Sequence, residues 1–287
     1  MQINDNGAGG FYIYAPDYDI ERTFTCGQCF RFSKAHDSEY KCEYRGVAYG
    51  RFMRFASDAD GNVHIFGAPR DEVEGVWIHY LSLDRDYDAI KKQVLCDFGG
   101  HPFMKSAIEQ TGGLRILAQE RFETLCSFII SQNNNIPRIT KLIETLSEKY
   151  GEAIETEYGT KYAFPTPASL AAVSEEELMS LKLGYRAKYI ADAAKRVSDG
   201  VLVLEKLNAQ NAREELLKVL GIGEKVACCI RLFSVEDFSS FPVDVWVKRI
   251  IASRFDGKLD PAKAGAYGGV AQQYLFCYER ELVQAGA

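Results

Sequence analysis

The chain has 287 residues, of which 47% are hydrophobic and 12% aromatic, so it can bury a core and lacks the composition of a disordered protein. Its apolar runs are too short for a membrane span, and its start lacks the pattern of a secretion signal, so we expect a cytoplasmic protein without membrane contact. A net charge of −6, concentrated in residues 1–100, excludes a strongly basic protein that coats nucleic acid.

Residues 1–99 are predicted to form an antiparallel β-sheet domain, because short runs rich in aromatic and β-branched residues follow one another. These runs are 11–14, 39–45, 51–55 and 63–66. The turn-like segment 58–62 separates the last two runs and predicts a hairpin. A helical stretch over 73–81 and a charged helix that ends near Cys96 complete this region.

Residues 100–287 are predicted to form a helical domain, because apolar residues recur at i, i+3 and i+4 spacing and Gly or Pro separates the segments. The expected helices are 114–117, 122–131, 136–149, 167–171, 174–182, 186–199, 209–219, 224–234, 244–254 and 261–284. The predicted fold class is therefore α+β, with an N-terminal antiparallel sheet followed by an all-helical domain.

Eight cysteines are spread mostly through apolar segments, and without a secretion signal we expect them to be reduced. Cys26 and Cys29 have the spacing of half a metal site, but no second pair or nearby histidine completes it. Structural thiols are the better interpretation of this pair.

The segment 216–229 contains the most informative local pattern. One helix ends, Gly221 and Gly223 make a tight turn, and a second helix begins with Lys225 in its first turn. Backbone amides exposed beside a helix N-terminus favour an anion, most simply a phosphate. Taken alone, Gly-x-Gly-x-Lys also fits a plain connection between helices, and it lacks the spacing of a P-loop.

A second pattern follows nineteen residues after Lys225. Pro242 and Val243 precede Asp244, which stands where the N-cap of a helix belongs. Capping alone is a sufficient structural explanation for this carboxylate.

The two patterns together resemble the helix-hairpin-helix signature of the base-excision DNA glycosylase superfamily. The lysine is similar to that of bifunctional members, whereas members that only hydrolyse the base keep the aspartate and lack the lysine. Segments 25–32, 125–139, 183–189 and 271–276 resemble motifs of the 8-oxoguanine DNA glycosylases of the eukaryotic type, which also occur in some bacteria. The resemblance runs from about Phe24 to Leu282 and implies a DNA glycosylase and AP lyase of base excision repair.

The resemblance implies how the lesion is bound and cleaved. Lys225 would attack C1′ of the sugar as a neutral amine, and Asp244 would stabilise the positive charge that develops there. Four residues would bind the flipped 8-oxoguanine. Phe276 and Cys229 would lie on its faces, Gln272 would contact its pairing edge, and the carbonyl of Gly27 would accept the N7 proton that guanine lacks.

The resemblance also implies how the duplex is held. Asn133 would fill the vacated stack, Tyr185 would wedge beside it, and Arg138 and Arg186 would bond the estranged cytosine. The remaining candidate DNA-binding residues are Gly221, Gly223 and Trp246. No cofactor is implied, apart from a monovalent or calcium ion that the hairpin carbonyls of Leu217, Val219 and Ile222 would hold.

Three positions depart from the family pattern: Leu220 replaces the usual proline of the hairpin, Cys29 replaces a serine, and Trp246 replaces the histidine of the eukaryotic enzymes. The expected partner is double-stranded DNA with 8-oxoguanine opposite cytosine, bound by a monomer.

A related glycosylase with another lesion preference is an alternative function, although only Cys277 follows the Asp244 helix, so the four-cysteine iron–sulfur cluster of some relatives is missing. A non-catalytic DNA-binding module is disfavoured by the presence of both the lysine and the aspartate. An unrelated Schiff-base enzyme is disfavoured by the helical pattern of residues 100–287.

Overall fold

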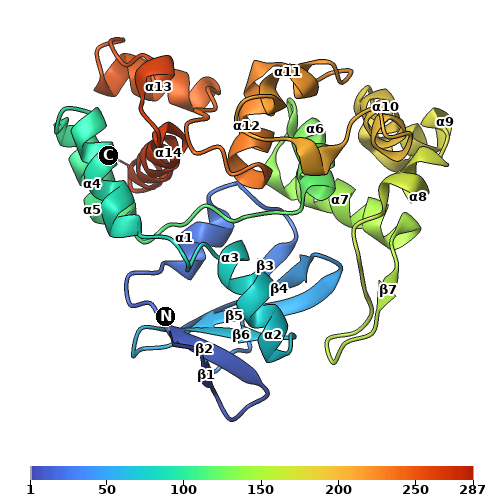
Figure 1. Ribbon diagram of the computed structural model, residues 1–287, viewed down its shortest axis with the longest axis horizontal. Helices are drawn as coiled ribbons and strands as arrows, with labels where there is room; N and C mark the ends of the chain where they lie inside the picture. The colour runs from blue at the N-terminus through green and yellow to red at the C-terminus, as the bar shows by residue number, and fades with distance from the viewer. Residues whose placement is uncertain (1, 287) are drawn as a thin grey trace.

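A computed structural model describes residues 2–286, and its N-terminal part is built on one six-stranded antiparallel sheet. The strand order is β1-β2-β6-β5-β4-β3 (Figure 1). The strands are β1 Asn4–Asp5, β2 Gly10–Tyr14, β3 Phe32–Lys34, β4 Cys42–Ala48, β5 Arg51–Ser57 and β6 Asn62–Phe66. The predicted hairpin at 58–62 is present between β5 and β6, whereas β1 and β3 were not predicted because they are too short to show a period.

Most helices form a layer above the sheet in Figure 1, whereas the short helices between residues 70 and 80 lie beside the strands. Those of the first half are α1 Ile20–Thr25, α2 Arg70–Glu72, the π-helical turn η1 Val73–Trp77, α3 Ile78–Tyr80, α4 Tyr87–Asp97, α5 Pro102–Thr111, α6 Arg121–Ser131 and α7 Ile136–Tyr150. Those of the second half are α8 Pro167–Ala171, α9 Glu175–Leu178, η2 Met179–Leu183, α10 Arg186–Ser198, η3 Leu204–Lys206, α11 Ala212–Leu217, α12 Glu224–Ser234, α13 Val245–Arg254, η4 Pro261–Lys263 and α14 Gly268–Gln284. Within residues 2–286, none of these helices combines the length and the apolar character that a membrane crossing requires.

Two hydrophobic cores stabilise the two parts of the molecule. The sheet packs its aromatic face, including Phe55, against Trp77 and Tyr80 of the short helices. The larger core joins the helices, and it also takes in Cys26 and Phe30 from the N-terminal part. The predicted sheet-plus-helices fold class is confirmed, while the boundary between residues 99 and 100 stays a prediction.

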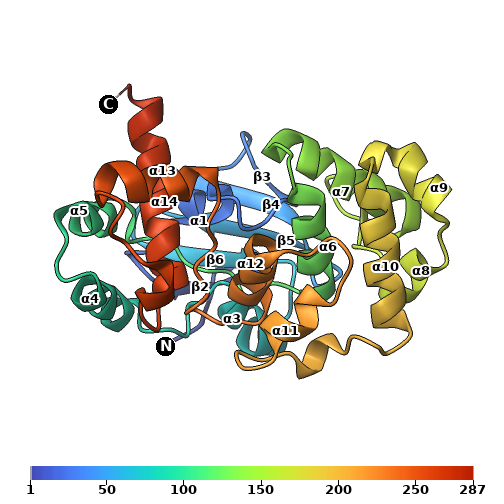
Figure 2. The ribbon, with the colours of Figure 1, turned by 90° about the horizontal axis from the view of Figure 1, so that it is seen from above.

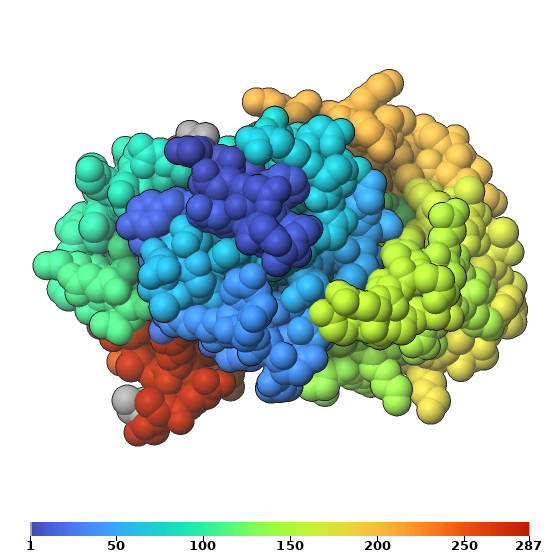
Figure 3. Space-filling model, turned by 90° about the horizontal axis from the view of Figure 1, so that it is seen from below, coloured from blue at the N-terminus to red at the C-terminus, as the bar shows by residue number. Residues whose placement is uncertain are grey.

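The hairpin of β7 Ala153–Ile154 and β8 Lys161–Tyr162 was not predicted, and it connects the helical part with the sheet. At its tip, the Tyr158 ring lies 4.1 Å from the guanidinium carbon of Arg45 and 5.6 Å from the ring centroid of Phe52. From below, the yellow-green hairpin lies beside the blue strands (Figure 3). The two layers are therefore in contact at this edge as well as through the core.

Two predicted helices are wrong. Segment 114–117 is extended and buried, because side chains of other elements satisfy its backbone: Tyr87 accepts from the Ile116 N–H, and Gln28 Oε1 accepts from the Leu117 N–H, each at 2.8 Å. The single helix expected over 261–284 is interrupted, since Gly265 has a φ of +81° and α14 begins only at residue 268. Helix α5 was not predicted at all.

Candidate active site

The turn between α11 and α12 is a compact hairpin, and its two glycines are present for different structural reasons. Gly221 has a φ of +81°, and a Cβ added there would lie 2.4 Å from the ring of Tyr189. An added Cβ at Gly223 would meet no atom within 4 Å, so the backbone there faces open space. The first glycine is thus required by the fold, and the second leaves room for a ligand close to the backbone.

Leu220, which replaces the usual proline, brings a compensating contact. Its N–H donates to Asp192 Oδ2 at 2.9 Å, and the same carboxylate oxygen accepts from Arg196 Nε at 2.8 Å. Proline could not make the first of these bonds because it has no N–H. The turn is therefore anchored to α10 rather than loosened.

Lys225 lies in the first turn of α12, where it is half-buried. Its Nζ is 5.6 Å from the ring centroid of Phe128, and it makes no ion pair in the part of the chain that the structure describes. Burial raises the pKa of the neighbouring Cys229 thiol to about 11, although the Lys225 ammonium acts in the opposite direction. At neutral pH the lysine therefore lies beside an uncharged thiol and an aromatic face.

Asp244 caps α13, as its position in the sequence indicates. Its Oδ1 accepts a hydrogen bond of 2.8 Å from the Val247 N–H, and the side chain is partly buried. Its Oδ2 has no hydrogen bond to any residue from 2 to 286. The cap fixes the carboxylate in place and leaves one oxygen available to a ligand.

One cleft of about 900 Å³ brings most of the predicted site residues together. It lies where α12, α13 and α14 meet the turn between α6 and α7 and the end of α1, and Figure 2 shows α13 and α14 on one side and α6 and α7 on the other. The predicted residues that line it are Gly27, Asn133, Gly223, Lys225, Cys229, Asp244, Trp246, Gln272 and Phe276. These residues span nearly the whole sequence, so the cleft is a product of the tertiary fold.

The end of the cleft that contains Phe276 is held by contacts between α1 and α14. Arg280 lies with its guanidinium carbon 5.4 Å from the centroid of the Phe276 ring and donates to the Thr25 carbonyl at 3.2 Å. Arg22 makes a two-pronged bond with Glu281, at 2.7 and 3.1 Å. These contacts fix the loop after α1, which contains Gly27, against the helix that contains Phe276.

The loop between α6 and α7 is held by a buried arginine. Arg186 is 3% exposed, and its guanidinium donates to the carbonyls of Gln132, Asn133 and Leu183. Asn133 itself is exposed and has a φ of +46°. The strained conformation of the asparagine is therefore supported from beneath by the arginine.

The other residues predicted to contact DNA surround this loop, although they do not line the cleft. Tyr185 is 47% exposed, its hydroxyl lies 3.3 Å from the Gln132 carbonyl, and the guanidinium carbon of Arg186 is 4.5 Å from its ring centroid. Arg138 is exposed and donates to the Lys182 carbonyl at 3.3 Å. An exposed aromatic ring and an exposed guanidinium thus flank the asparagine.

The hairpin also has carbonyl groups that could hold a cation. The Val219 carbonyl accepts from the Ile222 N–H at 3.1 Å, whereas the carbonyls of Leu217 and Ile222 have no hydrogen bond within residues 2–286. Two free carbonyls on one turn fit a hard or monovalent cation that takes oxygen ligands.

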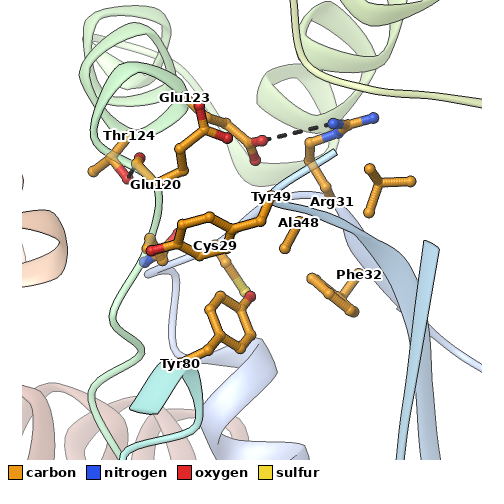
Figure 4. Close-up of a pocket in the computed structure, with 11 residues that line it drawn as sticks. Cys29, Arg31, Phe32, Ala48, Tyr49, Tyr80, Glu120, Glu123 and Thr124 are labelled. Carbon is orange, nitrogen blue, oxygen red and sulfur yellow. Dashed lines mark hydrogen bonds and ion pairs between the residues drawn. The ribbon is translucent and has the colours of Figure 1, made fainter. Parts of the chain in front are cut away.

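A second, water-sized cavity of about 10 Å³ lies between the sheet and α6 (Figure 4). Its wall includes Cys29, Tyr80 and Glu123, whose carboxylate faces Arg31 across 3.6 Å. Burial raises the pKa of Glu123 to about 7, although the arginine opposes this shift. The carboxyl group lies outside the main cleft.

Sequence reasoning missed several residues that support the site. Gln28 is fully buried, donates to the carbonyls of Thr23 and Arg115, and so orders the segment next to Gly27. Asp192 and Arg280 act through the contacts described above. In the sequence, the only indication of such a role was a polar residue next to a motif residue, as Gln28 is next to Gly27, and that indication is weak.

The fold and the cleft define a helix-hairpin-helix base-excision DNA glycosylase. The family model of the 8-oxoguanine DNA glycosylase N-terminal domain matches residues 12–125, and that of the HhH-GPD superfamily base excision DNA repair proteins matches residues 126–263. N-glycosylase/DNA lyase OGG1 of Arabidopsis thaliana is 30% identical over 282 residues, which cover 90% of this chain and 76% of the relative.

Solved structures agree with this result. The Clostridium acetobutylicum 8-oxoguanine glycosylase/lyase in complex with double-stranded DNA that contains cytosine opposite 8-oxoG has a TM-score of 0.88 at 36% identity, over 98% of both chains. MBOgg1 in complex with a low-affinity DNA ligand has a TM-score of 0.90 at 35% identity, over 99% of this chain and all of that one. The chain therefore belongs to the 8-oxoguanine DNA glycosylase family.

Proposed function

We propose that this cleft excises 8-oxoguanine opposite cytosine from double-stranded DNA and then cleaves the strand, as a bifunctional N-glycosylase/DNA lyase of base excision repair. The observation that carries the proposal is that Lys225 and Asp244 open into the same cleft as Gly27, Gln272 and Phe276. A nucleophile, a carboxylate and a set of base-sized contacts are thus within reach of one flipped nucleotide.

Lys225 supplies the nucleophile. Its amine forms a bond to C1′ while the bond from C1′ to the base breaks, and the base leaves with that electron pair and takes up a proton. Opening of the sugar ring gives a protonated Schiff base. Loss of a 2′ proton then expels the 3′ phosphate by β-elimination. The Phe128 ring and the neutral Cys229 thiol lie beside the amine, and neither can trap it in an ion pair.

Asp244 supplies charge stabilisation. As the base leaves, positive charge develops on the sugar, and a fixed carboxylate lowers the energy of that state without reorganising. The bond from Val247 N–H to Oδ1 provides this fixation, and Oδ2 is free to face the sugar. One side chain thus serves as helix cap and catalytic group.

The flipped base is held by stacking and by hydrogen bonds. Phe276 and Cys229 contact its two faces, Gln272 contacts its pairing edge, and the Gly27 carbonyl accepts the N7 proton. Guanine has no such proton, so binding it would bury the carbonyl unpaired. Arg280 supports this end of the cleft from behind the ring.

The duplex is held by the exposed rim of the cleft. Asn133 fills the gap left by the flipped nucleotide and Tyr185 wedges beside it, while Arg138 bonds the estranged cytosine. Arg186 also hydrogen-bonds the cytosine, and it supports the loop that contains Asn133.

The phosphate backbone is held by the hairpin. The backbone amides at Gly221 and Gly223 bind phosphate, and the indole N–H of Trp246 can donate to the same strand. A cation on the hairpin carbonyls of Leu217, Val219 and Ile222 would add positive charge there.

Borohydride trapping tests this function. A labelled duplex with one 8-oxoguanine opposite cytosine is incubated with the protein, and borohydride reduces any Schiff base to a stable protein–DNA adduct. We expect an adduct that maps to Lys225 and is missing with plain guanine and with Lys225→Gln. If neither an adduct nor strand cleavage is observed, the bifunctional mechanism is contradicted. Trapping only with a different damaged base would favour a related glycosylase.

A further inference from the structure

Two consecutive glutamines of α14 form a buried pair in the wall of the cleft. Gln272 and Gln273 are 3% and 5% exposed, and Gln273 Nε2 donates to Gln272 Oε1 at 2.8 Å. Both line the cleft that contains Lys225 and Phe276. The side-chain oxygen of Gln273 has no hydrogen-bond partner among residues 2–286.

An unpaired amide oxygen at this depth has a cost, and buried polar atoms in folded proteins are nearly always paired. The neighbouring buried positions Val270, Ala271 and Leu275 carry apolar side chains, so this part of α14 does not require a polar residue for packing. Because protein atoms enclose the Gln273 oxygen, a ligand in the cleft does not reach it, and the polar contact that this side chain contributes is its bond to Gln272.

The bond between the two side chains fixes which way the Gln272 amide points. Gln272 Oε1 accepts from Gln273, so the Nε2 of Gln272 points the other way, and it has no hydrogen-bond partner among residues 2–286. The pair therefore presents the Nε2 donor of Gln272 to the cleft.

A guanine-type purine has an acceptor on its pairing edge, the O6 carbonyl, that complements this donor. An adenine-type purine has a 6-amino donor at the same position, which would oppose donor to donor. Building on the proposed function, we propose that Gln273 is a specificity-determining residue of this site. Its Nε2 holds the Gln272 amide so that Gln272 Nε2 donates to O6 of the flipped base, and guanine-derived lesions are thereby selected over adenine-derived ones.

Single-turnover rates of base release test this role with Gln273→Met, which keeps the size of the side chain and removes both polar groups. The substrates are duplexes with 8-oxoguanine or 8-oxoadenine opposite cytosine, and a duplex with a preformed abasic site. We expect release of 8-oxoguanine to fall about 10- to 100-fold, as for a buried partner left unpaired. The ratio of the two release rates should narrow similarly, and β-elimination at the abasic site should stay unchanged.

Tyr274→Phe is the matched control. It removes a buried hydroxyl that has no hydrogen-bond partner among residues 2–286, at the next position of α14 and outside the cleft wall, and it should leave all three rates unchanged. An unchanged rate ratio in Gln273→Met would overturn the proposal. An equal loss on all three substrates would also overturn it, because that is the result of a purely structural role.

Gln273→Glu provides an independent test that does not depend on how well the methionine variant folds. The carboxylate cannot donate to Gln272, so Gln272 is expected to turn its Nε2 toward it and present its oxygen to the base. The ratio of 8-oxoguanine release to 8-oxoadenine release should then be lower in Gln273→Glu than in Gln273→Met. A ratio equal to that of the wild type would again contradict the proposal. If the wild-type protein releases neither base, the proposed function itself is refuted. If the wild type releases 8-oxoguanine and the Gln273 variants release the two bases at the wild-type ratio, only this inference is refuted.

Discussion

Replacing each hairpin glycine by alanine should separate folding from DNA binding. At Gly221, alanine must adopt a φ of +81°, which costs about 1–2 kcal/mol in an L-residue. Its Cβ would also lie 2.4–2.6 Å from three atoms of the Tyr189 ring, and forcing a packed ring aside costs about 1–3 kcal/mol. Gly221→Ala should therefore destabilise the protein by about 2–5 kcal/mol, a large part of the stability of a typical domain.

Gly223→Ala is the matched comparison, because its φ is −102° and the new Cβ meets no atom within 4 Å. It should cost about 1 kcal/mol or less, as for an exchange at an N-cap without a side-chain bond. Its effect should appear in DNA binding instead, since a methyl group would separate the backbone amides from a phosphate. We expect about tenfold weaker binding, equivalent to one charge-assisted hydrogen bond.

Urea unfolding followed by circular dichroism measures the first effect, and titration of a fluorescent duplex with a reduced abasic site, which the lyase cannot cleave, measures the second. A Gly221→Ala protein within about 0.5 kcal/mol of wild type would refute the steric argument. Equal losses of stability in both variants would refute the distinction between the two glycines. Unchanged DNA affinity in Gly223→Ala would mean that phosphate is bound elsewhere.

Three further substitutions test separate parts of the structure. Asp244→Asn keeps a capping oxygen but loses the charge, so single-turnover base release should fall about 10²–10³-fold at unchanged stability, and a normal rate would refute the electrostatic role. Glu123→Gln tests a group whose pKa of about 7 in the folded protein exceeds its ordinary 4.5. The folded wild type keeps a proton on Glu123 that the unfolded chain has released, so its free energy of unfolding falls as pH rises from about 4.5 to about 7. In urea titrations, the free energy of unfolding of the variant should exceed that of the wild type by up to about 3 kcal/mol more at pH 8 than at pH 4. An equal pH dependence of stability in the two proteins would contradict this. Asp192→Ala removes the acceptor of the Leu220 N–H and should cost about 1–2 kcal/mol and weaken duplex binding, whereas unchanged affinity would show that the turn needs no anchor.

Local patterns predicted the elements whose structure is decided locally. The strands around the 58–62 turn and the start of α12 at Glu224 follow from alternation and from glycine and cap positions. The segment 114–117 could not be predicted in this way, because its extended backbone depends on Gln28 and Tyr87, which are distant in the sequence.

The candidate site was predictable to a similar extent. The motifs indicated Lys225 and Asp244, and the resemblance supplied the remaining residues. The sequence could not indicate that Arg186 lies under the Asn133 loop, or that Gln273 bonds Gln272, because both facts depend on how side chains point in the folded protein. Composition and spacing carry no information about such orientation.

The contacts between α1 and α14 join the two ends of the chain around the cleft. Lys225 and Asp244 lie within the superfamily region, residues 126–263, whereas Gly27, Gln272 and Phe276 lie outside it on the flanking segments. Apart from Cys229, the residues that we propose to contact the lesion thus lie on other segments than the two that we propose to act on the sugar. Substitutions in the two flanking segments are therefore expected to change which damaged base is bound, while the nucleophile and its carboxylate stay as they are.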